Sequence, residues 1–225
     1  MDDALLRKLA DLAVGAGANV QRDQIVAIGA EPGKEPLARA IAASAYRAGA
    51  KFVDVSYFDL AVKRARLEHA AEDTLDFVPS WYGARYLGLG EHRGARISVQ
   101  PNPEPGILAG VDPARAGRDG LPFVPEIFTV INDRSTNWTV VPFPTPTWAS
   151  HVHPSLDPDE ALARLDDQIL HVCRLDEPDP VAAWGERADA LAAVARRLDE
   201  RRFDAIHFDG PGTDLTIGLL PTSRW

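Results

Sequence analysis

The sequence contains a single cysteine, Cys173, among its 225 residues. One cysteine excludes an internal disulfide bond and is typical of proteins kept in a reducing compartment. No stretch approaches the ~18 uninterrupted apolar residues that a membrane-spanning helix needs. The first residues also lack the basic and then apolar segments of a secretory signal. These absences favour a cytoplasmic protein with no membrane partner.

Positive charge is also scarce. The chain has 24 Lys and Arg against 33 Asp and Glu, which gives a net charge of −9. A protein of this sign repels the phosphate backbone of nucleic acids and the surface of anionic lipids. We therefore expect no nucleic-acid partner. Hydrophobic residues make up 45% of the chain, which is enough for a globular core.

Short apolar runs alternate with segments of helical spacing over most of the chain. Runs that are apolar on both faces suit strands of a parallel sheet. The predicted strands of this kind are 24–28, 51–56, 96–99 and 138–141. Single helices between such strands make βαβ units, which place helices on both faces of the sheet. The sequence therefore predicts an α/β fold, a Rossmann-like parallel sheet with helices on both faces.

Two helices are clearly signalled after the proline-rich turn at 142–146. Asp157 and Pro158 predict the cap and first position of one helix, and Asp179 and Pro180 predict the start of the next. A strand over 203–208 is expected to close this part of the chain. We place the resulting N-terminal α/β domain at residues 1–209.

The final segment differs from the earlier strands. Residues 213–219 alternate apolar with small or polar side chains, the pattern of a half-buried strand. Only six residues follow, so this strand has no later partner. It either adds to the existing sheet or begins a second, mostly antiparallel domain. We favour the second alternative and expect residues 210–225 to be the start of a truncated second domain.

The segment Gly-Ala-Glu-Pro-Gly-Lys at 29–34 stands between a strand and a helix, where phosphate-binding loops occur. Its glycine spacing fits neither a Walker loop nor the dinucleotide fingerprint. Glu31 and Glu35 would also repel phosphate. We interpret the segment as an ordinary turn between a strand and a helix.

His151 and His153 would point the same way on an extended segment and form half of a metal site. No third carboxylate or imidazole stands at an obvious ligand spacing, whereas zinc needs three or four protein ligands. A solvated turn before Asp157 is the preferred interpretation. Ser150 lacks the Gly-x-Ser-x-Gly context of a serine hydrolase.

The remaining candidates each have an ordinary explanation. Cys173 follows an apolar helical stripe and is expected to be a buried structural thiol. Asp54 and Asp59 lie near a strand end, where α/β sites gather, although a helix cap explains Asp59 equally well. His207 faces away from its apolar neighbours, and nothing nominates it further.

The tryptophans Trp138, Trp148 and Trp184 are expected in the core rather than in a ligand platform. The residues alone therefore nominate no catalytic, metal-binding or cofactor-binding residue in this chain.

Three longer segments carry a more specific pattern: Asn137–Ala149, Cys173–Trp184 and Gly210–Leu219. Their order and spacing resemble the N-terminal domain of the thermophilic metallo-aminopeptidases, the group of aminopeptidase T, aminopeptidase S and leucyl aminopeptidases. The leucine-rich first helix and residues 49–55 also look like that family. The resemblance covers nearly the whole chain and is weakest across 113–135.

The resemblance implies a hydrolase that releases N-terminal amino acids from peptides with two divalent metal ions, zinc, cobalt or similar. It also implies a homodimer. In the family, the metal ligands and the catalytic glutamate lie in the second domain. No position here matches those motifs, so we expect them downstream of Trp225 and expect the chain alone to be inactive. The alternative is a non-catalytic α/β module that binds a small molecule, anion or nucleotide near Gly29 and Asp54.

Overall fold

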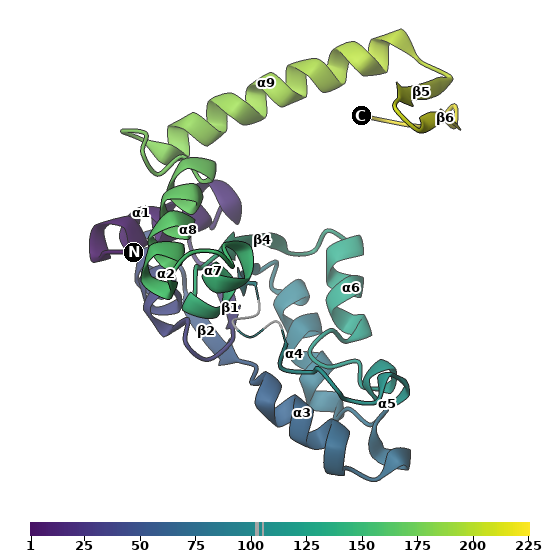
Figure 1. Ribbon diagram of the computed structural model, residues 1–225. Helices are drawn as coiled ribbons and strands as arrows, with labels where there is room; N and C mark the ends of the chain where they lie inside the picture. Colours follow the sequence, from purple (N-terminus) through teal and green to yellow (C-terminus); the bar gives the residue numbers. More distant parts are fainter. Residues whose placement is uncertain (102–103, 105) are drawn as a thin grey trace. The chain divides into compact units, whose positions relative to one another are not determined.

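Figure 1 shows the computed structural model, which describes every residue except 102–103 and 105. The chain forms two compact units, residues 1–181 and residues 182–225. The first unit contains a four-stranded sheet, and the second contains a two-stranded sheet. The boundary that we expect at residue 209 thus differs from the division into compact units, and it stays a prediction.

The first unit is built on a parallel sheet with strand order β2-β1-β3-β4. Its strands are β1 (Ile25–Ala30), β2 (Phe52–Tyr57), β3 (Ala95–Gln100) and β4 (Asn137–Pro142). The pairings of β1 with β2, of β1 with β3 and of β3 with β4 are all parallel. The parallel α/β fold predicted from the apolar runs is therefore confirmed.

Helices flank this sheet on both sides. They are α1 (Asp3–Leu12), α2 (Glu35–Arg47), α3 (Leu60–His69), α4 (Ser80–Glu91), α5 (Pro113–Arg118), α6 (Pro125–Asn132), α7 (Pro146–Val152) and α8 (Pro158–Val172). Asp157 caps α8 as predicted, because its carboxylate accepts hydrogen bonds from two backbone N–H groups of the first turn. The region 113–135, where the family resemblance is weakest, holds the two short helices α5 and α6. Within the described ranges, no helix has both the length and the apolar character to cross a bilayer.

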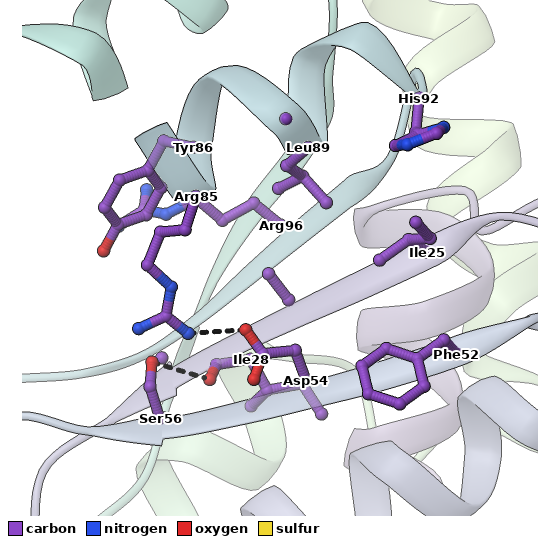
Figure 2. Close-up of a pocket in the computed structure, with 13 residues that line it drawn as sticks. Ile25, Ile28, Phe52, Asp54, Ser56, Arg85, Tyr86, Leu89, His92 and Arg96 are labelled. Atoms are coloured by element: carbon purple, nitrogen blue, oxygen red, sulfur yellow. Dashed lines mark hydrogen bonds and ion pairs between the residues drawn. The ribbon is translucent and has the colours of Figure 1, made fainter. Parts of the chain in front are cut away.

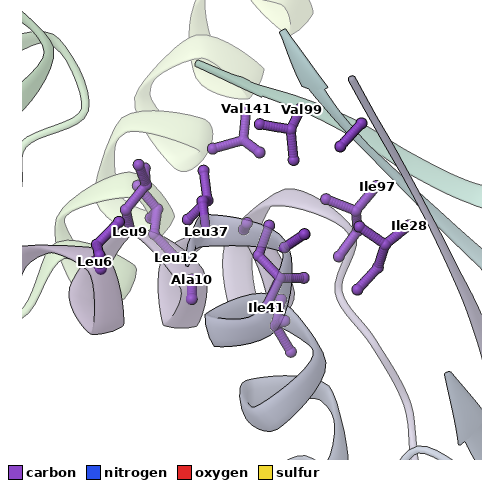
Figure 3. Packing of buried hydrophobic residues seen from close by; sticks show 14 of the residues in the cluster. Leu6, Leu9, Ala10, Leu12, Ile28, Leu37, Ile41, Ile97, Val99 and Val141 are labelled. Atoms are coloured by element: carbon purple, nitrogen blue, oxygen red, sulfur yellow. The ribbon is translucent and has the colours of Figure 1, made fainter. Parts of the chain in front are cut away.

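One face of the sheet is closed by α1 and α2, which pack against each other (Figure 3). Leu9 of α1 and Leu37 and Ile41 of α2 are fully buried there, together with Ile28 and Ile97 from the two central strands. Burying each such side chain contributes roughly 1.5–3 kcal/mol to stability. This face therefore holds most of the core.

The opposite face is covered less completely. Along β1, the residues that alternate with the buried Val26 and Ile28 are only partly buried, because successive strand residues point to opposite faces. On the edge strand β4, Trp138 and Val140 are each about half exposed. Helix α4 lies over this side and packs on α6.

The second unit contains most of α9 (Pro180–Arg201) and a hairpin of β5 (Ala205–Gly210) and β6 (Thr213–Gly218). The two strands are antiparallel, with Phe208 opposite Leu215. Pro211 and Gly212 form the turn, and Gly212 has the positive φ of 77° that the second central position of a type II turn requires. The final strand therefore pairs with the strand that precedes it. The antiparallel character expected of this segment is present.

Candidate functional site

A hollow lies over the less covered face of the sheet, between the strands and α4 (Figure 2). Its floor is formed by β1, whose residues on this face, Ala27 and Gly29, are small. A Cβ atom added at Gly29 would meet no other atom within 4 Å, so the space above this glycine is open. In the register of the sheet, Ala27 lies between Asp54 of β2 and Arg96 of β3. Gly29 lies between Ser56 of β2 and Ser98 of β3.

The hollow consists of two adjoining cavities of about 250 and 320 Å³. Both are lined by Gly29, Ser56, Arg85, Tyr86 and Arg96, and we call them together the α4 cleft. The larger cavity lies at the carboxyl ends of the strands, where open α/β sheets usually bind ligands. Its volume is near the lower end of the range of small-molecule sites, roughly 300–1,000 Å³.

An ion pair joins the two walls of the cleft. The guanidinium of Arg85 on α4 donates a hydrogen bond to the carboxylate of Asp54 on β2 (Figure 2). Both side chains are more than a third exposed, so the pair contributes only about 0–1 kcal/mol to stability. Its main effect is to fix the position of Asp54, which the sequence nominates together with Gly29 for a small-molecule site.

Arg96 is the second guanidinium of the cleft and has no such partner. Its guanidinium carbon lies 6.0 Å from the centre of the Tyr86 ring, and that of Arg85 lies 5.9 Å from the same centre. Among the residues that the structure describes, no carboxylate lies within ion-pairing distance of Arg96 and no acceptor receives its N–H groups. Burial lowers the pKa of Arg96, while Tyr86 and Tyr82 oppose that effect.

Two hydroxyl groups complete the polar lining. Burial, together with the neighbouring Tyr86, raises the pKa of Tyr82 to about 12, so this phenol stays neutral at physiological pH. Ser98 is only 5% exposed, and its Oγ has no hydrogen-bond partner among the described residues. An unsatisfied buried polar group of this kind costs about 1–3 kcal/mol.

Lys34 shows why the turn after β1 is not a phosphate loop. The side chain is fully buried, and its ammonium group donates to the Glu31 carboxylate and to the backbone oxygens of Val99 and Pro101. An ammonium group has three N–H donors, and all three are used here. Burial lowers the pKa of Lys34 despite the nearby Glu31. The interpretation as an ordinary turn agrees with this geometry.

The two histidines lie at the carboxyl end of α7 and not on an extended segment. His151 is exposed in the last helical turn, and His153 is the C-cap, with its Nε2 2.9 Å from Oε1 of Gln168. Ser150 is exposed on the same helix. None of the described residues joins this pair as a third metal ligand.

The other sequence candidates lie outside the cleft. Cys173 is buried, as expected, and burial raises the pKa of its thiol. Asp59 is the N-cap of α3 and accepts a hydrogen bond of 2.8 Å from the N–H of Ala61. His207 is exposed on β5, where its Nδ1 lies 2.8 Å from the hydroxyl oxygen of Thr216 on β6.

The prediction that the three tryptophans lie in the core was wrong for two of them. Trp138 is 51% exposed and Trp184 is 37% exposed, whereas Trp148 is partly buried against the core. Trp138 is exposed because β4 is an edge strand and its outer face has no covering helix comparable to α2.

Sequence reasoning missed Arg85, Arg96, Tyr86 and Ser98. A usable signal was present in β3, where Arg96 and Ser98 interrupt an otherwise apolar strand at a spacing of two residues. Such spacing places both side chains on the same face of the sheet.

Within the described residues, no group of three or more His, Cys, Asp or Glu side chains is arranged to hold a metal ion. A zinc site needs three or four protein ligands. These residues therefore do not fit a catalytic metal, and the placement of the metal ligands downstream of Trp225 stays a prediction.

The fold and the site together define a parallel α/β domain with an arginine-lined cleft and, in its described part, no metal centre. Residues 2–225 match the family described as Thermophilic metalloprotease (M29). The chain belongs to this family.

Similar proteins agree with this assignment. The chain is 39% identical over 227 residues to Aminopeptidase T of Thermus aquaticus, and 37% identical over 226 residues to Aminopeptidase PepS of Streptococcus thermophilus. Each alignment covers 98% of this chain and 54% of the relative. The solved structure of wild-type AmpT from Thermus thermophilus is similar with a TM-score of 0.85 and 36% identity, over 96% of this chain and 53% of that one. The chain thus spans about half the length of the curated relatives that it matches.

Proposed function

We propose that the chain is the N-terminal part of a metal-dependent aminopeptidase, a hydrolase that releases N-terminal amino acids from peptides. The observation that carries the proposal is the match of residues 2–225 to the metalloprotease family. Relatives named aminopeptidase, which align over 98% of the chain, support the same activity.

The metal ions and their ligands belong, in this proposal, to the part of the relatives' length that the chain does not span. The described residues contain no ligand group for a metal, which supports that placement. The complete enzyme uses two divalent ions, zinc, cobalt or similar. Residues 210–225, which include β6, begin the domain that binds them. We assign no catalytic or metal-binding residue to this chain.

Two proteins, the chain alone and a chimera, test where the metal ligands lie. The 225-residue chain alone, purified free of host peptidases, is expected to release no p-nitroaniline from leucine p-nitroanilide with added cobalt or zinc. A chimera in which this chain replaces the matching 54% of Aminopeptidase T is expected to be active and to lose activity with a chelator. Metal-dependent turnover by the chain alone would contradict the placement of the ligands. A folded but inactive chimera would contradict the proposed activity.

We also propose that the complete enzyme is a cytoplasmic homodimer. Several large apolar side chains of the first unit are at least half exposed and would be available for burial in such an assembly. They include Phe77, Trp81 and Phe128. Light scattering of the chimera measures its mass in solution, and a monomer at micromolar concentration would contradict the dimer.

A further inference from the structure

The geometry points to a ligand for the α4 cleft: the carboxylate of a small organic acid with an apolar or aromatic body. Arg96 binds the carboxylate, and the cavity at the strand ends holds the body. This inference rests on the cleft alone and is independent of the proposed peptidase activity.

When the charged side chains at the cleft are matched with their ion-pair partners, one positive group has no negative partner among the described residues. Glu31 is paired with Lys34, and Asp54 is paired with Arg85. Arg96 is partly buried and has no carboxylate partner among the described residues. A buried charge is costly unless it is paired and hydrogen-bonded. A ligand with one negative charge supplies the missing partner.

Hydrogen-bond donors lie on both sides of the open space. Ser98 follows Arg96 by two residues on the same face of β3, and its buried hydroxyl has no partner among the described residues. Across Gly29, the Ser56 hydroxyl has only a long contact of 3.5 Å with the Ile28 oxygen. A carboxylate accepts a bidentate hydrogen bond from a guanidinium and further bonds from hydroxyl groups.

The same features disfavour a phosphate ligand. A phosphate monoester carries a charge of about −1.5 to −2 at neutral pH, which exceeds the single free charge of the cleft. Lys34, the lysine that a phosphate loop would offer, is buried and uses its three donors within the protein.

The cavity at the strand ends suits an apolar body. Its volume is about 320 Å³. The residues that line it include Tyr57, Phe58, Leu60, Tyr82, Tyr86 and Phe123, which are apolar or aromatic. Aromatic rings beside the Arg96 guanidinium favour an acid with an aromatic body over a purely polar acid, because the rings bury the apolar part of the ligand away from water.

Calorimetric titration of the 225-residue chain with 3-phenylpropionate tests the inference. We expect saturable 1:1 binding that is at least tenfold tighter than binding of the neutral analogue 3-phenylpropanamide, because the charge-assisted hydrogen bonds are lost with the charge. Phenyl phosphate is expected to bind less tightly than the acid. No saturable binding of 3-phenylpropionate, equal binding of the amide, or tighter binding of phenyl phosphate would each overturn the inference.

Two variants locate the site. Arg96→Gln removes the free charge, and we expect it to weaken binding of the acid by about 10- to 100-fold. Gly29→Leu keeps both arginines but fills space that is open in the structure, and we expect it to abolish binding. Arg39→Gln is the matched control, since Arg39 is exposed on α2, the helix that covers the opposite face. Binding that survives in both Arg96→Gln and Gly29→Leu would show that the acid binds elsewhere.

The carboxylate has two sources, a free amino acid or the C-terminus of a peptide. Titration with phenylalanine and with N-acetyl-Gly-Gly-Phe separates them, because acetylation prevents release of the first residue by any aminopeptidase. Binding of either one that Arg96→Gln weakens supports the site and identifies its source. Failure of both to bind would overturn the assignment to carboxylates of biological origin.

Discussion

Replacing Lys34 by methionine tests how much the hydrogen bonds of its ammonium group stabilise the fold at the end of β1. The Lys34 side chain is fully buried, and its ammonium group donates to Glu31 in the turn before α2, to the backbone oxygen of Val99 in β3 and to that of Pro101 after β3. Methionine retains much of the apolar stem and removes all three donors.

The expected loss of stability follows from the groups left without a partner. Each unsatisfied buried acceptor costs about 1–3 kcal/mol, and removal of one member of a buried ion pair costs about 3–5 kcal/mol. Relief from burying the ammonium group offsets part of this cost. We therefore expect Lys34→Met to lower the free energy of unfolding by about 3 kcal/mol. The double variant Lys34→Met/Glu31→Gln is expected to recover about 1–2 kcal/mol of this, because the buried carboxylate charge is also removed.

Urea unfolding followed by circular dichroism measures both values. The pH dependence gives an independent check, since burial lowers the pKa of Lys34 below its ordinary value of 10.5. Between the lowered pKa and 10.5, the unfolded chain binds more protons than the folded one, so this lysine makes stability rise with pH. The methionine variant is expected to lack that contribution. A loss of less than about 1 kcal/mol, or a double variant no more stable than the single one, would refute the reasoning.

Three further predictions concern the core, a helix cap and a tyrosine. Ile41→Ala, at a fully buried position of α2, is expected to cost about 2–5 kcal/mol in urea unfolding, whereas Arg39→Ala on the exposed side of the same helix should change stability by less than about 0.5 kcal/mol. Asp59→Ala removes the N-cap of α3 and should cost about 1 kcal/mol, with Asp59→Asn retaining most of the stability; equal thermal midpoints for the two variants would contradict this. Since the pKa of Tyr82 is raised to about 12, absorbance at 295 nm should show one tyrosine ionising near that pH, and Tyr82→Phe should remove that step. Between about pH 10 and 12 the folded chain keeps the Tyr82 proton that the unfolded chain loses, so the stability of the wild type should fall relative to that of Tyr82→Phe over that range.

The elements that the sequence predicts well are those set by local patterns. The apolar runs of β1 and β3 and the caps at Asp59 and Asp157 involve residues within a few positions of one another. The strands follow from the periodicity of their side chains, and the caps follow from backbone N–H groups at the helix start that need an acceptor.

The α4 cleft was not predictable in the same way. It exists because Gly29 is flanked in register by Ser56 and Ser98, which come from strands distant in the sequence. The exposure of Trp138 likewise depends on strand order, which places β4 at the edge. Gly29 and Asp54, the two positions that the sequence nominates for a small-molecule site, both line the cleft.

The order of the strands has a consequence for how the chain is made. β1 lies between β2 and β3, yet β3 begins only at Ala95, long after β1 ends at Ala30. At a synthesis rate of about 5–20 residues per second, one edge of β1 waits roughly 3–13 s for its second neighbour. During that interval the apolar run Ile25–Ile28 has an open edge of the kind that pairs with other chains. We therefore expect the nascent protein to be most prone to aggregation before residue 100 has emerged.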